Sequence, residues 1–401
     1  MTRFDTGIAA VSSRRAFLRR LGKAAKAGII ASPTLTLLHG CASKRCRSGP
    51  QFCREDWLAL WSAYKTAFVS ADGRVIDHAA ESITTSEGQS YAMFFALVVD
   101  DRELFDRLLQ WTQRNLADGD LTATLPAWKW GQRGGEGWGV IDSNSASDSD
   151  LWIAYDLIEA GRLWQQPGYS ALGRSLARRV VKECGFKAHD RFFLLPAAHG
   201  FGPDDAGRVT LNPSYSPIFL LDRLHSETQD QAWLDLIDSA IETLDARRET
   251  GFAPDWIDWQ ADEGFLTAAQ GSAGSYDAIR TYLWWGLTHP ARRSAVGLDE
   301  ALAGMARHLD HNLYPPRLAD SETGATTGTA PPGFSAALIP YLAARGREQA
   351  QATQLERVFA TLDRQTSLLG SEPFYYDQNL ALFGLSEQVF SFSRSGELIH
   401  T

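Results

Sequence analysis

From about residue 54 to the C-terminus, aromatic and aliphatic residues recur along this chain with the period of an α-helix. Trp57, Trp61, Tyr64 and Phe68 stand at positions i, i+4, i+7 and i+11, which places them on one helical face. Similar patterns predict helices over residues 89–99, 101–115, 149–163, 170–183, 215–225, 231–247, 276–287, 299–311, 334–344, 351–362 and 377–385. Alternating patterns typical of strands are scarce, and residues 191–195 are the best candidate.

The helical segments follow one another without a linker or a shift in composition, which favours one all-α domain over residues 54–401. Loops rich in Gly, Pro, Ser and Asn separate them, for example residues 131–147 and 320–333. About twelve helices can pair as six hairpins that close a ring, so we expect an (α/α)6 toroid, or barrel. In such a ring the even-numbered helices line the inside, and their N-termini meet at one end.

The first forty residues have a different character. They carry seven Lys/Arg and one Asp, a net charge of +6 that leaves −15 on the remainder. A basic start, a short apolar stretch over residues 27–38 and small residues thereafter predict an export signal, and residues 13–18 resemble the twin-arginine consensus. Residues 38–41 resemble a lipobox ending at Cys41, so both lipidation of Cys41 and simple cleavage stay open. Residues 41–53 then form a linker to the helical domain.

The whole-chain composition excludes several classes of protein and site. A formal net charge of −9 argues against nucleic-acid binding, and four Cys residues are too few for a disulfide scaffold. The sequence does not settle whether Cys46 pairs with Cys53, or the state of Cys184. No Cys/His cluster has zinc-ligand spacing, so we expect no metal and no cofactor. The 13 Trp, 11 Tyr and 20 Phe are a supply of rings that a carbohydrate-binding groove would use.

Five of the predicted inner helices begin with carboxylates, amides or tyrosines. These starts include Glu87, Asp148, Tyr215, Asp277 and Tyr376. Each polar residue alone is also explained as a helix cap. Capping does not explain the aromatic residues nearby. These are Tyr276 and, in the loop before residue 149 that also contains Asn144, Trp128, Trp130 and Trp138. Because indoles in an exposed polar loop are unfavourable unless covered or bound, we interpret the set as a polysaccharide site, with core packing as the alternative.

Three acids are candidates for breaking a glycosidic bond, which requires one carboxylic acid and one carboxylate. Asp277 and Arg280 stand at i, i+3 on one helix, so the guanidinium can hold Asp277 ionised as a base, unless the two form only a surface ion pair. Glu87 has no cation within a helical turn, and a nearby Asp148 carboxylate would favour its protonated form.

These segments resemble the motifs of glycoside hydrolase family 8, in order and over nearly the whole chain from residue 54. The similar segments are Ser86-Glu87-Gly88-Gln89-Ser90-Tyr91, residues 142–154, Asn212-Pro213-Ser214-Tyr215, Ser275-Tyr276-Asp277-Ala278-Ile279-Arg280, residues 334–337 and Tyr375-Tyr376-Asp377-Gln378-Asn379. Within the family, the chain is most similar to the periplasmic endoglucanases that accompany bacterial cellulose synthase. Ser149 stands where Gly or Ala is commoner, and the twin-arginine signal replaces an ordinary secretory signal.

The resemblance implies an (α/α)6 barrel that hydrolyses β-1,4-glucan with inversion. It implies Glu87 as general acid, Asp277 as general base and Asp148 as the residue that binds and distorts the sugar in the −1 subsite. Trp128, Trp130, Trp138, Asn144, Tyr215, Tyr276, Arg280 and Tyr376 are the residues expected to bind substrate. We expect a monomer whose partners are the glucan and the cellulose synthase export complex, with membrane contact only through a lipid anchor. The alternatives are chitosan or xylan as substrate, a non-catalytic glucan-binding lipoprotein, and a polysaccharide lyase. The lack of a Lys/Arg cluster in the motif loops argues against the lyase.

Overall fold

The computed structural model describes residues 52–401 with the exception of residue 136. The predicted export signal over residues 1–40, Cys41 and Cys46 lie outside these described residues. Among the described helices, none is both long enough and apolar enough to cross a membrane.

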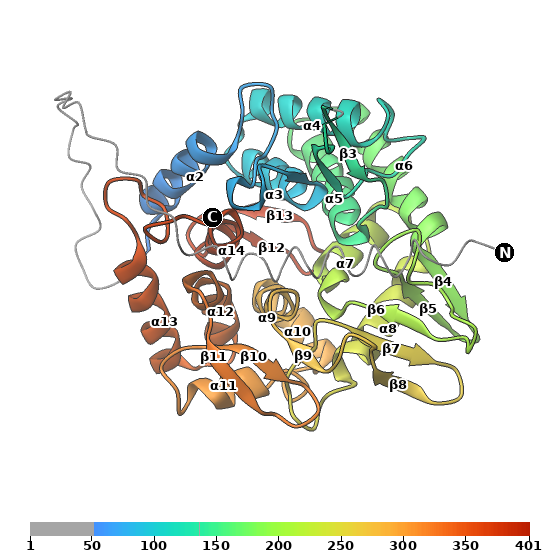
Figure 1. Cartoon of the computed structure of the whole chain (residues 1–401), viewed down its shortest axis with the longest axis vertical. Coiled ribbons are helices and arrows are strands. Elements are labelled where there is room, and N and C mark those ends of the chain that lie inside the picture. Colours follow the sequence, from blue (N-terminus) through green and yellow to red (C-terminus); the bar gives the residue numbers. More distant parts are fainter. Residues whose placement is uncertain (1–51, 136) are drawn as a thin grey trace.

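The helices form two concentric rings, as the (α/α)6 prediction requires (Figure 1). The inner ring consists of α3 (Ser86–Val98), α5 (Ser147–Leu163), α7 (Ile218–Thr228), α9 (Ala278–Leu287), α12 (Pro332–Ala344) and α14 (Tyr375–Gly384). The outer layer consists of α2 (Arg54–Phe68), α4 (Arg102–Leu116), α6 (Pro167–Cys184), α8 (Ala232–Asp245), α10 (Pro290–Val296), α11 (Gly304–Leu309) and α13 (Glu348–Thr361). The predicted helix over 299–311 shrinks to α11, and the pattern missed the short helix α10.

The two rings differ in how much of each helix is buried. In α2 only one stripe is buried, the face that carries Trp57, Trp61 and Tyr64. In α3 every residue except Glu87 is buried, and every residue of α14 is buried. An amphipathic stripe suits a helix with one side in water, whereas a helix apolar on all sides must lie inside.

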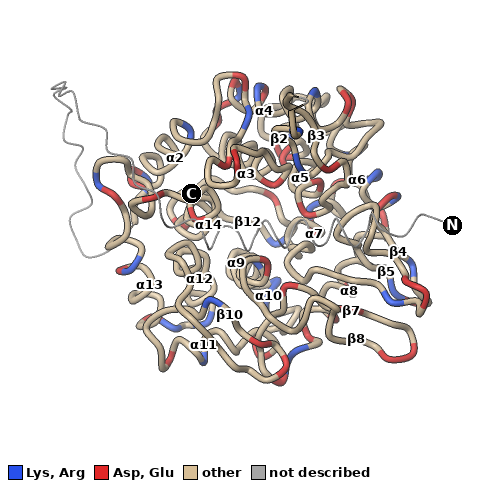
Figure 2. Tube along the Cα trace, in the orientation of Figure 1, with Lys and Arg blue, Asp and Glu red and all other residues tan. Residues whose placement is uncertain are grey.

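Charges are sparse on the inner helices α3, α9, α12 and α14, whereas α5 and α7 carry several, and many Lys, Arg, Asp and Glu residues lie on the outer helices and loops (Figure 2). Glu87 is the only charged residue of α3, Arg280 the only one of α9 and Asp377 the only one of α14. A lone charge on an otherwise buried helix is unfavourable unless it is paired, so these three positions are candidates for function.

Short strands are far more numerous than the sequence pattern predicted. The predicted strand over 191–195 is confirmed as β5 (Arg191–Leu194). The others are β1 (Thr84–Thr85), β2 (Lys129–Gln132), β3 (Trp138–Asp142), β4 (Gly185–Ala188), β6 (Val209–Leu211), β7 (Ile257–Gln260), β8 (Gly264–Thr267), β9 (Ala273–Gly274), β10 (Pro316–Asp320), β11 (Thr326–Thr329), β12 (Phe390–Phe392) and β13 (Leu398–His400). Strands of two to five residues give too few alternations for a period of two to be detected.

The strands pair as small antiparallel sheets, and they interrupt what the sequence presents as loops. The hairpin β2–β3, which joins β1, overlaps the predicted loop over residues 131–147. The strand β11, which pairs with β10, lies within the predicted loop over 320–333. The sheets β1-β2-β3 and β9-β10-β11 both contribute residues to the cavity described below.

Aromatic rings from several inner helices fill the interior of the barrel. The ring of Phe383 lies 5.0 Å from Tyr91, 5.4 Å from Phe94, 5.2 Å from Trp152 and 5.0 Å from Trp284, measured between centroids. Tyr91 is one helical turn beyond Glu87, and Trp152 one turn beyond Asp148. The first turns of α3 and α5 therefore present their acids directly above a packed aromatic floor.

Candidate active site

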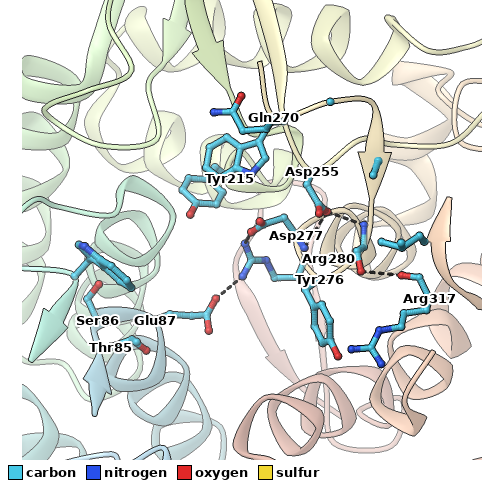
Figure 3. A pocket seen from close by; sticks show the side chains of 16 residues that line it. Thr85, Ser86, Glu87, Tyr215, Asp255, Gln270, Tyr276, Asp277, Arg280 and Arg317 are labelled. Carbon is cyan, nitrogen blue, oxygen red and sulfur yellow. Dashed lines mark hydrogen bonds and ion pairs between the residues drawn. The ribbon is translucent and has the colours of Figure 1, made fainter. Parts of the chain in front are cut away.

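A cavity of about 330 Å³ opens at the end of the barrel where α3 and α9 begin (Figure 3). Its wall combines helix starts, strand ends and loops. It is lined by Thr85, Ser86, Glu87, Trp128, Tyr215, Asp255, Trp256, Gln270, Gly271, Ala273, Ser275, Tyr276, Asp277, Arg280, Arg317 and Leu318. This mixture of indole, phenol, carboxylate and guanidinium is suited to a ligand with both apolar faces and hydroxyl edges.

Glu87 projects into the cavity from the first turn of α3. Thr85 caps this helix, because its hydroxyl accepts the Gly88 N–H at 3.1 Å. The Tyr375 hydroxyl donates to Glu87 Oε1 at 3.4 Å, and Glu87 Oε2 pairs with Arg280 Nη1. The side chain of Glu87 is 17% exposed, more than those of Asp148 at 6% and Asp277 at 7%. Glu87 is thus the member of the acidic set with the best access to solvent or ligand.

The Arg280 guanidinium joins all three acids predicted from the sequence. Its Nη2 lies 2.7 Å from Asp277 Oδ1 and 3.5 Å from Asp148 Oδ2, while its Nη1 pairs with Glu87. Nη2 also donates to Ser214 Oγ at 3.2 Å. The Arg280 side chain is only 4% exposed, so the alternative of a solvated surface pair with Asp277 is wrong.

Electrostatics keep this arginine charged despite its burial. Desolvation alone would lower the pKa of Arg280, but Tyr376, Tyr91, Glu87 and Asp277 together raise it well above its usual value. One permanent cation therefore stands between three carboxylates. If all three were ionised, the cluster would carry an excess of negative charge, which favours the uptake of a proton.

A fourth carboxyl group, which the sequence reasoning missed, supports Asp277 from behind. Asp255 Oδ1 accepts backbone N–H groups from Ser275 at 2.7 Å, Asp277 at 3.1 Å and Ala278 at 2.8 Å. Burial, followed by the charge of Asp277, raises the pKa of Asp255 to about 7. Asp255 thereby fixes the backbone at the start of α9 and is a second titrating group beside the predicted base.

The structure places the predicted substrate-binding residues in two groups. Trp128, Tyr215, Tyr276 and Arg280 line the cavity together with Glu87 and Asp277, whereas Asp148 is not among the lining residues and contacts the site through Arg280. Trp130, Trp138, Asn144 and Tyr376 are not among its lining residues.

The residues of the second group have identifiable contacts. The Asn144 amide bonds the backbone of His199 through a donated bond at 2.8 Å and an accepted one at 3.2 Å. The Tyr376 hydroxyl donates to the Tyr276 carbonyl at 2.6 Å, so it positions the backbone next to Asp277. Trp130 and Trp138 belong to the β2–β3 hairpin.

Sequence reasoning also missed several parts of the site. It expected no cation beside Glu87, yet Arg280 reaches Glu87 from another helix, because pairing across the barrel does not appear in spacing along one helix. Asp255, Gln270 and Arg317 escaped notice since they lie outside the helix starts that drew attention. The sequence did contain one signal for Asp255, since an acid directly beside an indole, here Trp256, is the combination already taken as a mark of a polysaccharide site.

Comparison with known proteins agrees with this geometry. Residues 45–389 match the model of the glycosyl hydrolases family 8. The chain belongs to this family. It is a glycoside hydrolase with the (α/α)6 fold, so the expected family, fold and enzyme class are confirmed.

The hydrolase has similar relatives in several bacteria. It is 40% identical to an endoglucanase of Xanthomonas axonopodis pv. citri, covering 85% of this chain and 88% of the relative, and 40% identical to an endoglucanase of Escherichia coli K12, covering 86% and 90%. Among solved structures, an endo-1,4-D-glucanase from Vibrio fischeri matches with a TM-score of 0.75 at 36% identity, covering 85% of this chain and 98% of that chain. An endo-beta-1,4-glucanase from Acetobacter xylinum matches with a TM-score of 0.66 at 27% identity, covering 82% and 97%.

Proposed function

We propose that the hydrolase cleaves β-1,4-glucosidic bonds within glucan chains such as cellulose, with inversion at the anomeric carbon. The observation that supports this most is the meeting of Glu87, Asp148 and Asp277 around Arg280, with Glu87, Asp277 and Arg280 lining one cavity that aromatic side chains also line. The relatives described as endoglucanases support glucan as the substrate.

In the proposed reaction, Glu87 is the general acid. It gives its proton to the leaving glycosidic oxygen as the bond to the anomeric carbon breaks. Because Glu87 is the most exposed of the three acids, it is the member of the cluster best placed to take up a proton and turn to the substrate. Arg280 then still pairs with Asp277 and Asp148, and the protonation reduces the excess negative charge of the cluster.

Asp277 is the general base in this proposal. It takes a proton from a water molecule whose oxygen attacks the anomeric carbon from the face opposite the leaving group. The Arg280 contact at 2.7 Å and the neighbouring N–H bonds to Asp255 hold Asp277 in place and oriented. In the same proposal Asp148, whose Oδ1 accepts the Ser149 N–H at 2.8 Å, binds and distorts the sugar at the point of cleavage.

Conservative substitutions test these roles. Glu87→Gln and Asp277→Asn should each lower the hydrolysis of carboxymethylcellulose by about 10³-fold or more, because each removes a proton-transfer group without changing the shape of the cavity. Reducing-sugar release measures the loss, and binding of the same variants to soluble glucan should persist.

A fully active Asp277→Asn variant would remove the base assignment, and a wild-type protein that binds glucan without cleaving it would leave only a binding protein. NMR of the first products on cellulose, xylan and chitosan reports the substrate and the anomer together. Inversion also requires about 6.5–9.5 Å between the Glu87 and Asp277 carboxyls in a complex with substrate, whereas about 5 Å indicates retention.

We further propose that the hydrolase is exported and trims glucan during cellulose synthesis and secretion. The twin-arginine-like start, the lipobox-like sequence ending at Cys41 and the resemblance to synthase-associated endoglucanases support this setting. Cell fractionation, together with mass spectrometry of the mature N-terminus, tests export and lipidation. A mature protein that keeps residues 1–40 in the cytoplasm would contradict it.

A further inference from the structure

Two indoles singled out from the sequence lie outside the catalytic cavity and form a stack of their own. Trp130 on β2 and Trp138 on β3 pack with centroids 5.4 Å apart and planes 22° apart. Trp138 is 48% exposed, whereas Trp130 is half-buried. The stack is therefore covered on its inner side and open to solvent at Trp138.

Several contacts hold this pair in a fixed arrangement. Trp111 of α4 packs edge-on against Trp130 at 5.3 Å. The Arg74 guanidinium lies 4.4 Å from the Trp130 centroid and 4.8 Å from that of Trp138, and its Nε donates to Thr84 Oγ1 at 2.8 Å. An indole that is rigidly supported yet half exposed contributes little to a core. Such a ring is pre-organised for a ligand, because binding then orders no side chain.

The stack is continuous with the catalytic cavity through the sheet β1-β2-β3. Thr85 of β1 and Trp128, which stands just before β2, line the cavity, and in the ladder between β1 and β2 Thr85 pairs with Lys129 and Thr84 with Trp130. Trp130 follows Trp128 by two residues along the chain, across a register shift between Lys129 and Trp130. The hairpin β2–β3 thus leaves the cavity at Trp128 and carries the stacked pair Trp130 and Trp138 beyond it.

Exposed polar groups accompany the outer indole. Gln132 is directly opposite Trp138 in the ladder between β2 and β3, and it is exposed. A pyranose ring in a β-1,4-linked chain presents C–H groups on its faces and hydroxyls at its edges. Trp138 offers a flat surface to such a face, and Gln132 offers an amide to the hydroxyls.

We propose that Trp138, backed by Trp130 and Arg74, is a binding platform for the part of a β-1,4-glucan chain that extends beyond the catalytic cavity. The inference rests on the proposed function for the class of ligand, and it adds a second point of attachment that only long chains can reach. Binding at both points holds a polymer on the enzyme more tightly than an oligosaccharide that fills the cavity alone.

Affinity electrophoresis in hydroxyethyl cellulose and kinetics on two chain lengths test the platform. In the full chain carrying Glu87→Gln, the further change Trp138→Ala should weaken polymer binding by about three- to tenfold. With Glu87 intact, Trp138→Ala should lower the ratio of kcat/KM on the long polymer to kcat/KM on cellotetraose by a similar factor. Trp138→Phe should restore much of the loss, since a ring remains.

Ile141 provides a matched control on the same strand. It is 42% exposed and packs over Gly131, on the face of the hairpin opposite Trp130. Ile141→Ala should leave the polymer affinity and the ratio unchanged. Equal polymer binding by Glu87→Gln with and without Trp138→Ala, or equal losses in the Trp138 and Ile141 variants, would overturn the proposal. The first result would indicate that the exposed Trp138 surface serves a protein partner instead. Affinity electrophoresis measures binding and needs no catalysis. A wild-type protein that does not hydrolyse glucan would therefore refute the proposed function, and the binding of the Trp138 variants would still test the platform.

Discussion

Arg280 is the residue on which the chemistry of the cavity depends most directly. One buried guanidinium meets two carboxylates that belong to other helices and one that belongs to its own helix. Removing the cation would leave buried like charges facing one another, which is strongly destabilising. The planar fork of the side chain also fixes where each acid stands, a task that a lysine ammonium does not perform.

Asp255 provides a test at the residue scale. Because its pKa is raised to about 7, by burial first and by the charge of Asp277 second, Asp255 is uncharged below about pH 6 and gains a negative charge as the pH rises through 7. Asn is uncharged at every pH. The pH profiles of kcat/KM for wild type and Asp255→Asn should therefore coincide on the acid side and separate above neutrality.

The variant should lose activity at a lower pH, by about one unit, because wild type gains a negative charge that opposes the loss of the proton on the catalytic acid. Asp255→Ala is the comparison that removes the three accepted N–H bonds, and it should lose activity at all pH values. An Asp255→Asn profile that runs parallel to wild type at every pH would show that Asp255 has a structural role only.

The sequence allowed the individual acids to be predicted, but not the contacts that surround them. Glu87, Asp148 and Asp277 were recognisable because each stands at the start of a predicted helix, and the structure brings all three together. Their contacts were not predictable, since the Arg280–Glu87 pair joins α9 to α3 across 193 positions of the chain. Spacing rules describe neighbours on one helix, whereas this cluster is created by closure of the ring.

At the scale of elements, the inner helices approach one another through glycines. A Cβ at Gly384, the last residue of α14, would lie 1.9 Å from the carbonyl oxygen of Ala336 in α12. A Cβ at Gly286 in α9 would lie 2.3 Å from the Tyr341 backbone nitrogen in the same neighbouring helix. Backbone atoms cannot yield as side-chain tips do, so these contacts set the spacing of the inner ring.

Gly384→Ala tests this close packing. The added methyl must separate α12 from α14, and we expect the free energy of unfolding to fall by about 2–3 kcal/mol. Gly168→Ala in α6 is the matched control, because nothing lies within 4 Å of the corresponding Cβ. It should raise the stability by up to about 1 kcal/mol, through helix propensity. Urea unfolding followed by circular dichroism measures both, and equal effects of the two substitutions would contradict the packing argument.

Elements were predictable in proportion to their length. Long periodic segments such as α5 and α6 agree with their predicted ranges to within about three residues. The seven-residue α10 and the two-residue strands β1 and β9 left no detectable period, although β1 and the loop before β2 supply Thr85 and Trp128 to the cavity. The short elements that shape the site are thus the ones that sequence patterns describe least.

For the whole molecule, the burial of three acids couples stability to pH. The pKa of Asp77 is raised to about 6, and those of Asp255 and Asp377 to about 7, in each case mainly by burial. A carboxyl whose pKa is higher in the folded state binds protons more tightly there than in the unfolded chain. Its contribution to stability is complete below about pH 4 and is lost as the pH rises to 7.

Asp377→Asn isolates one of these groups, since it keeps the shape of the side chain and removes the charge. Arg357 offsets only part of the effect of burial on the pKa of Asp377. The variant should therefore gain stability over wild type as the pH rises from 4.5 to 7.5, by up to about 4 kcal/mol at the upper end. Urea unfolding at several pH values measures the difference, with Asp262→Asn on the exposed loop between β7 and β8 as the control that should show none. A stability difference for Asp377→Asn that stays constant across this range would mean that Asp377 is ionised in the folded protein throughout, and the carboxylate would then need a partner stronger than Arg357.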